Sequence, residues 1–299
     1  MRHLPILFLT TLITISCTME KQPDTFDLQG HRGARGLMPE NTIPAFLKAV
    51  DLGVDTVEFD VVVTADGQIL VSHEPWFNHL FSSKPDGSPV TEDEERSFNI
   101  YEMTYEETQQ FDVGQRQNPN FPEQETMEVT KPLLAEAIRA VEEYAKENGI
   151  DPLHYNIETK SRPEWYGEYV PGPEEFSRLL YEELNELGVL DRVIIQSFDP
   201  STLIAFKQLA PDVRQAMLVS NDVLPDMYIN LLGYTPEIWS PDYKLLNAES
   251  VSQLQSKGMQ VIPWTVNNVD EMRELLRFGV DGFITDYPDS ASVLRKIAD

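Results

Sequence analysis

The sequence AESVSQLQSKGMQVIPWTVNNVDEMRELLRFGVDGFIT, residues 248–285, indicates the fold class most clearly. It alternates segments of helical spacing with short apolar strands, in the order 248–257, 260–266, 270–278 and 282–285. Each helical segment ends next to a glycine, Gly258 or Gly279, which is typical of helix C-termini. Helices that alternate with strands predict a parallel sheet.

The same alternation continues toward the N-terminus. Eight strands are predicted, at 26–30, 56–64, 154–159, 193–197, 215–219, 238–240, 260–266 and 282–285. Helices are predicted at 42–52, 133–148, 174–187, 201–209, 226–232, 248–257, 270–278 and 290–297. Eight such units predict an α/β fold of the (β/α)8 TIM-barrel type. The alternative, an open doubly wound sheet, is disfavoured because no glycine-rich phosphate loop follows the first strand.

One region interrupts the repeat. After the second strand, the turn at 65–67 leads into a returning strand at 69–72. Residues 74–130 are rich in Pro, Asn, Glu and Gln, with one short helix expected at 105–111. Because so long a stretch is rarely structureless in a compact domain, we expect a small inserted lobe after the hairpin.

The N-terminus is typical of an exported protein. Residues 1–17 form a short polar start and an apolar run that is too brief to span a bilayer, which predicts a signal peptide. Cys17, the only cysteine, ends this segment and resembles the lipidated cysteine of bacterial lipoproteins. Ordinary cleavage with an incidental cysteine is the alternative. We therefore expect a tether at 18–25, a barrel domain at 26–299, membrane attachment through a lipid anchor, and a periplasmic or cell-envelope location.

The charge balance restricts the partners. With 50 acidic and 23 basic residues the net charge is −27, which excludes nucleic acid because phosphate-backbone binding needs clustered Lys and Arg. A small phosphate substrate is still possible, since a bound divalent cation can invert the local charge. The sequence predicts no particular oligomeric state.

Acidic side chains gather on two neighbouring strands of the predicted barrel. Glu58 and Asp60 share one strand face, and Glu158 lies on the next strand along the chain. Carboxylates at such spacing repel one another unless a cation lies between them, and hard cations such as Mg²⁺ and Ca²⁺ choose oxygen ligands. The alternative is that Glu58 and Asp60 are exposed charges on a half-buried strand.

Two histidines follow strands at the same end of the predicted barrel, His31 and His73. A histidine with a pKa near neutrality can give or take a proton, and phosphodiester cleavage needs both a base and an acid. One histidine at a strand end is more often a structural hydrogen-bond partner. Two histidines beside three carboxylates favour catalysis.

These motifs resemble the glycerophosphodiester phosphodiesterase family over about residues 28–290. The matching segments are His31-Arg32-Gly33, Pro39-Glu40-Asn41-Thr42, Ala45-Phe46, Gly53-Val54-Asp55, Glu58-Phe59-Asp60-Val61, Thr64-Ala65-Asp66-Gly67, Val71-Ser72-His73, Asn156-Ile157-Glu158-Thr159-Lys160, Gln196-Ser197-Phe198-Asp199, Trp264-Thr265-Val266-Asn267 and the stretch from Asp281 to Pro288.

The resemblance implies hydrolysis of a small glycerophosphodiester to sn-glycerol 3-phosphate and an alcohol, with one divalent cation, Ca²⁺ or Mg²⁺. The implied metal ligands are Glu58, Asp60 and Glu158. The implied catalytic pair is His31 as acid and His73 as base. The residues implied to contact the substrate are Arg32, Lys160 and Trp264.

The resemblance further implies that Glu40 braces His31. The chain departs from the family pattern at Glu74, where the family usually has Asp, so the geometry around His73 is open. Two rival functions remain: a barrel phospholipase acting on intact or lyso lipids, and a non-catalytic, lipid-tethered binding protein.

Overall fold

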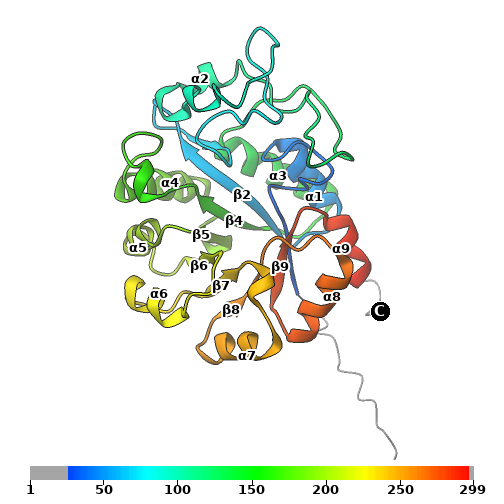
Figure 1. Ribbon diagram of the computed structural model, residues 1–299, viewed down its shortest axis with the longest axis vertical. Coiled ribbons are helices and arrows are strands. Elements are labelled where there is room, and N and C mark those ends of the chain that lie inside the picture. The colour runs from blue at the N-terminus through cyan, green and yellow to red at the C-terminus, as the bar shows by residue number, and fades with distance from the viewer. Residues whose placement is uncertain (1–25, 296–299) are drawn as a thin grey trace, which may run out of the picture.

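The computed structural model describes residues 26–295 (Figure 1). The predicted signal peptide, Cys17 and the tether lie outside the described residues, as does the end of the predicted last helix. Among the described residues, no helix is both long and apolar enough to cross a membrane.

Eight parallel strands form the central sheet in the order β8-β7-β6-β5-β4-β2-β1-β9. Their bounds are β1 (Asp27–Gly30), β2 (Thr56–Val63), β4 (His154–Thr159), β5 (Val193–Ser197), β6 (Arg214–Val219), β7 (Ile238–Pro241), β8 (Gln260–Val261) and β9 (Gly282–Thr285). The first and last strands pair along their whole length, from Asp27 opposite Gly282 to Gly30 opposite Thr285. The predicted barrel of eight βα units is confirmed, and the sheet is nearly closed.

Closure is completed by irregular backbone hydrogen bonds between β8 and β9. The amide of Asp281 donates to the carbonyl of Val261, and that of Ile284 donates to Pro263. The amide of Val266 donates back to Ile284. The prediction of a strand over 260–266 was too long, because Pro263 has no N–H to continue a regular ladder. The segment still hydrogen-bonds both neighbouring strands, so Trp264 stays at the rim of the barrel.

Helices pack around the strands in an outer ring (Figure 1). They are α1 (Ile43–Asp51), α3 (Leu134–Asn148), α4 (Pro173–Leu187), α5 (Pro200–Leu209), α6 (Pro225–Leu232), α7 (Ala248–Ser256), α8 (Val269–Phe278) and α9 (Pro288–Arg295). Helices α4, α5, α6 and α9 begin at a proline, one or two residues before their predicted starts, since the fixed φ of proline suits the first helical position. Gly188 and Gly279 end their helices in the left-handed conformation, as expected.

The two sides of the barrel interior differ in polarity. Trp264 packs against an apolar cluster of five buried residues on, or in the case of Ile262 directly after, successive strands: Ile194, Ala216, Ile238, Ile262 and Ile284. On β2 and β4 the inward positions are instead polar, with Glu58, Asp60 and Asn156 all buried. The alternative of exposed charges on a half-buried strand is therefore wrong, because every residue of β2 is buried.

The segment after β3 (Ile69–Val71), which pairs antiparallel with β2, folds over the top of the barrel in Figure 1. It contains short 3₁₀ turns at Glu95–Ser97 and Ile100–Glu102, and one helix, α2 (Tyr105–Thr108). The helix ends three residues earlier than predicted. The segment packs against Val62 of β2 and Leu70 of β3 in a small separate apolar core, to which it contributes Phe77, Phe81, Val90, Ile100, Phe111 and Val113. We call residues 74–130 the inserted lobe.

Candidate active site

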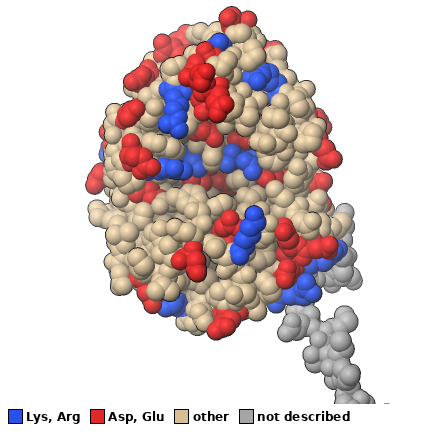
Figure 2. Space-filling view, viewed as in Figure 1, with Lys and Arg blue, Asp and Glu red and all other residues tan. Residues whose placement is uncertain are grey.

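A cavity of about 210 Å³ lies at one end of the barrel, among residues of the strands and of the loops that follow them. Figure 2 shows a hollow across the molecule below the inserted lobe, with basic side chains on both sides of it. The cavity is lined by His31, Arg32, Arg35, Glu58, His73, Glu158, Lys160, Gln196, Phe198, Leu218, Trp264, Thr265 and Ile284. The structure thus brings both predicted histidines, all three predicted substrate contacts and two of the predicted metal ligands into one cavity.

The third predicted ligand, Asp60, lies directly beside this lining. Asp60 and Glu158 are register partners on β2 and β4. Glu58, Asp60 and Glu158 each offer an oxygen within 4.8 Å of the others. The Oδ1 atom of Asp60 is buried and has no hydrogen-bond partner among residues 26–295. An orphaned carboxylate oxygen beside two further carboxylates is the donor set that Mg²⁺ or Ca²⁺ prefers, so these residues could hold such a cation.

The electrostatics of this triad also fit a cation. Burial, then the charges of Asp60 and Glu158, raise the pKa of Glu58 well above its usual value. Burial likewise raises the pKa of Glu158. Burial opposes ionisation of Asp60 too, but Arg32 and Lys160 outweigh it and hold the Asp60 pKa well below its ordinary value. Lys160 Nζ is 2.7 Å from Glu158 and 3.6 Å from Asp60, so the protein supplies part of the needed positive charge itself.

Hydrogen-bond donors hold both carboxylate oxygens of Glu58 and the second oxygen of Asp60. The amide of Arg32 and the side chain of Gln196 donate to the two oxygens of Glu58, at 2.7 and 2.8 Å. The side-chain amide of Asn41 donates to Asp60 at 2.8 Å. Arg32 and Asn41 both have positive φ, 50° and 56°, which is uncommon for residues other than glycine and is found at functional sites.

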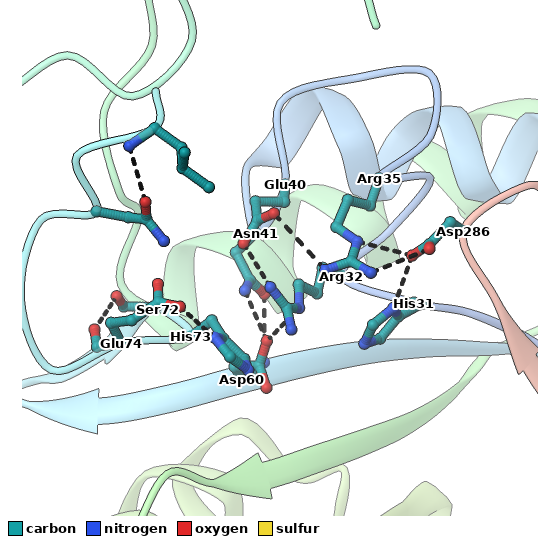
Figure 3. Close-up of polar contacts among 12 residues, drawn as sticks. His31, Arg32, Arg35, Glu40, Asn41, Asp60, Ser72, His73, Glu74 and Asp286 are labelled. Carbon is teal, nitrogen blue, oxygen red and sulfur yellow. Dashed lines mark hydrogen bonds and ion pairs between the residues drawn. The ribbon is translucent and has the colours of Figure 1, made fainter. Parts of the chain in front are cut away.

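Arg32 is fixed as a rigid cation at the edge of the cavity (Figure 3). Its Nη1 donates to Glu40 at 2.6 Å, and its Nε lies 3.0 Å from Asp60. The expectation that Glu40 braces His31 is therefore wrong: Glu40 contacts Arg32 and, at 3.9 Å, Arg35. A guanidinium held on one side by two carboxylates can present its other N–H groups to a phosphate.

His31 is braced by Asp286. Its Nδ1 lies 2.7 Å from Asp286 Oδ1, and two N–H groups of Arg35 donate hydrogen bonds to the same carboxylate (Figure 3). Burial and the charge of Arg35 lower the pKa of His31 to about 4, against the opposing effect of Asp286. Asp286 directly follows the strand predicted at 282–285, but no role was predicted for it from the sequence. The signal was available, because β9 adjoins β1, and Asp286 and His31 each follow their strand directly.

His73 is braced by its own neighbour in the sequence. Its Nδ1 lies 2.6 Å from Glu74 Oε1. Burial opposes the charge of Glu74, but His73, Arg32 and Lys131 hold the Glu74 pKa well below its ordinary value. The longer side chain at this position therefore reaches the histidine ring as an ionised carboxylate. Of the other wall residues, Trp264 donates its indole N–H to Ser240 and meets Phe198 edge to face.

Comparison with known proteins decides the family. Residues 31–290 match the sequence model of the glycerophosphoryl diester phosphodiesterase family. This chain belongs to that family. A glycerophosphodiester phosphodiesterase from Bacillus altitudinis is 33% identical, over 89% of this chain and 96% of its own length.

Solved structures agree with this glycerophosphodiesterase assignment. A crystal structure from Silicibacter pomeroyi, whose name proposes the same activity, superposes with a TM-score of 0.82 at 28% identity, covering 92% of this chain and 95% of the other. An Oleispira antarctica phosphodiesterase, solved in complex with its product sn-glycerol-3-phosphate, shares the fold with a TM-score of 0.70 at 22% identity, covering 89% and 96%. The chain is accordingly an enzyme of the glycerophosphodiester phosphodiesterase class.

Proposed function

We propose that this phosphodiesterase uses one divalent cation, Ca²⁺ or Mg²⁺, to hydrolyse small glycerophosphodiesters to sn-glycerol 3-phosphate and an alcohol. The observation that carries the proposal is that one cavity brings both histidines, Arg32, Glu58 and Glu158 together, with Asp60, the third carboxylate of the buried triad, directly beside it. The product bound by the Oleispira relative supports the same chemistry.

The residues of the cavity divide the work. Arg32 and Lys160 bind the phosphodiester anion, and Trp264 bounds the site with an apolar wall. Glu58, Asp60 and Glu158 hold the cation, which supplies positive charge to the phosphoryl oxygens when it is bound. The negative net charge of the protein is no obstacle, because Arg32, Lys160 and the divalent cation would set the local charge at the site.

The two imidazoles move the protons. One takes the proton of the glycerol hydroxyl that attacks phosphorus, while the other gives a proton to the oxygen of the departing alcohol. One P–O bond forms and one breaks, which leaves a cyclic phosphate. Water then opens the ring with the two histidines in exchanged roles, and glycerol 3-phosphate is released.

A direct assay tests this function. Purified enzyme with Ca²⁺ or Mg²⁺ should release glycerol 3-phosphate and choline from glycerophosphocholine, and excess chelator should stop the reaction. Parallel assays with lysophosphatidylcholine and phosphatidylcholine test the rival phospholipase function. If only the lipids were cleaved, or if nothing were cleaved with either cation, the proposal would be wrong.

We further propose that the enzyme is an exported lipoprotein of the periplasm or cell envelope, attached to the membrane through Cys17. The position of this single cysteine after the apolar run of residues 4–15 supports the proposal. Small glycerophosphodiesters released from membrane lipids would then reach the enzyme outside the cytoplasm.

A further inference from the structure

Asp286 accepts hydrogen bonds at both of its carboxylate oxygens, and it is almost fully buried. Arg35 Nε and His31 Nδ1 each approach Oδ1 at 2.7 Å. Arg35 Nη2 donates to Oδ2 at 3.0 Å, and Asn267 Nδ2 donates to the same oxygen at 2.7 Å. Figure 3 shows the carboxylate of Asp286 between Arg35 and His31.

Three of these four contacts have a fixed direction, because neither Arg35 nor the nitrogen of Asn267 can accept a hydrogen bond. The amide of Asn267 cannot be reversed without loss, since its oxygen accepts from the backbone N–H of Asp286 and from Thr285. Asp286 is therefore an ionised acceptor, and its pKa is held well below the ordinary value despite burial, by the charge of Arg35 and by the hydrogen bonds from His31 and Arg35.

An ionised acceptor at Nδ1 decides the tautomer of His31. The proton must lie on Nδ1, since a bare nitrogen would face a bare carboxylate oxygen. In the neutral imidazole with this tautomer, the remaining ring nitrogen, Nε2, carries a lone pair. His31 lines the cavity in which the substrate is proposed to bind, so this lone pair lies on a residue that contacts the substrate.

The two histidines differ in what neutralises their carboxylates. Asp286 is already paired with Arg35, so a second proton on His31 would add a net positive charge beside Arg35 and Arg32. Glu74 has no partner within ion-pair distance other than His73 among residues 26–295, although the charges of Arg32 and Lys131 also lower its pKa. A proton on His73 therefore neutralises Glu74 instead of adding to a cation. Asp60 and Glu158 also face His73, but the proposed cation would offset their charge, so the difference rests on the two bracing carboxylates.

We propose that Asp286 is a positioning residue that keeps a proton on Nδ1 of His31 and makes Nε2 of His31 the base of the first step. His73, backed by Glu74, is then the acid. This inference rests on the two-histidine function proposed above, and it reverses the order of roles that the family resemblance implies. The hydroxyl proton of the substrate passes to His31 Nε2 as the new P–O bond forms. The leaving oxygen takes its proton from His73 as the old P–O bond breaks.

The first test observes the tautomer directly. Nitrogen-15 labelling of the histidines and two-bond ¹H–¹⁵N NMR distinguish Nδ1–H, Nε2–H and the imidazolium, and His31→Gln identifies the His31 signals. At pH 7, with and without Mg²⁺, His31 should be neutral with its proton on Nδ1. An Nε2–H tautomer or an imidazolium at His31 would overturn the proposal. Because no turnover is needed, this result is independent of whether the proposed substrate is correct.

The second test separates base from acid by the leaving group. Asp286→Asn should lower kcat by roughly 10²–10⁴-fold, with little change in KM, on both glycerophosphocholine and the p-nitrophenyl ester of glycerol phosphate. Loss of a base matters for every leaving group. Glu74→Gln should instead be impaired mainly on glycerophosphocholine, because p-nitrophenolate leaves without protonation.

The matched control is Asp281→Asn. Asp281 precedes β9 at the opposite end of the barrel, where its carboxylate accepts from the amide of Val261. This variant should keep the native kcat on both substrates. The proposal fails if folded Asp286→Asn is fully active. It also fails if Asp286→Asn regains activity on the p-nitrophenyl ester while Glu74→Gln does not. Wild-type enzyme that cleaves neither ester would refute the proposed function instead.

Discussion

Gln124, in the inserted lobe, donates to the backbone carbonyl of Arg35 at 2.7 Å, across 89 positions of sequence. The same amide group donates to the carbonyl of Met38 at 2.8 Å. Phe121 adds its ring, which lies 4.7 Å from the guanidinium carbon of Arg35. The lobe therefore holds the loop that carries His31 and Arg32, and it is more than a cover for the cavity.

We predict that Gln124→Ala weakens both the fold and the activity. Two carbonyls, one of them buried, would lose their donor, and an unsatisfied buried polar group costs about 1–3 kcal/mol. Urea unfolding should show a loss in that range, and kcat should fall because Arg35 no longer aligns Asp286. Gln117→Ala is the control, because Gln117 is exposed and bonds only within the lobe. Equal stability of the two variants would contradict this role of the lobe.

Cation binding should stabilise the folded enzyme. A ligand that binds only the native state at about 100 times its Kd adds about 2.7 kcal/mol to the free energy of unfolding. We therefore expect Ca²⁺ or Mg²⁺ to raise Tm, and chelator to reverse the rise. Glu58→Gln and Asp60→Asn should fold but lose most of this response. A Tm that is insensitive to both cations would argue against the triad as the binding site.

Glu183 should make stability depend on pH. Burial raises its pKa from 4.5 to about 7. Between these values the native state binds more protons than the unfolded chain, so the free energy of unfolding falls as pH rises from about 4.5 to 7. Glu183→Gln should remove this slope and gain about 1–2 kcal/mol at pH 8, with no gain at pH 4. The exposed neighbour Glu182 provides the control, and a Glu183→Gln curve parallel to wild type would contradict the prediction.

Lipidation of Cys17 should determine where the enzyme is found. Several acyl chains bind a membrane firmly, so the native protein should partition into detergent and remain with the membrane fraction. Cys17→Ala should be released as a soluble protein or stay unprocessed. Mass spectrometry of the native N-terminus gives the decisive measurement, and an unmodified cysteine there would refute the anchor.

The sequence predicted the parts of the fold that depend on periodicity. Strand alternation placed Glu58 and Asp60 on one face, and the order of the strands placed Glu158 on a neighbouring strand. The register adds that Glu158 stands opposite Asp60. The site also depends on contacts that no local pattern contains. His31 meets Asp286 across 255 positions, and Glu40 meets Arg32 within a loop that has positive φ at Arg32, Gly33 and Asn41. Such contacts follow from ring closure and loop geometry, so only the folded chain reveals them.

The pairing of β9 with β1 makes the order of synthesis significant. Ribosomes deliver His31, Arg32 and all three carboxylates of the triad long before β9 and Asp286 are translated. An unfinished polypeptide therefore contains most of the residues that line the cavity, but it lacks the carboxylate that orients His31. Catalytic competence thus arises in one late event, when the C-terminal strand docks against the N-terminal one, and a truncated or nicked product that lacks this strand would be inert.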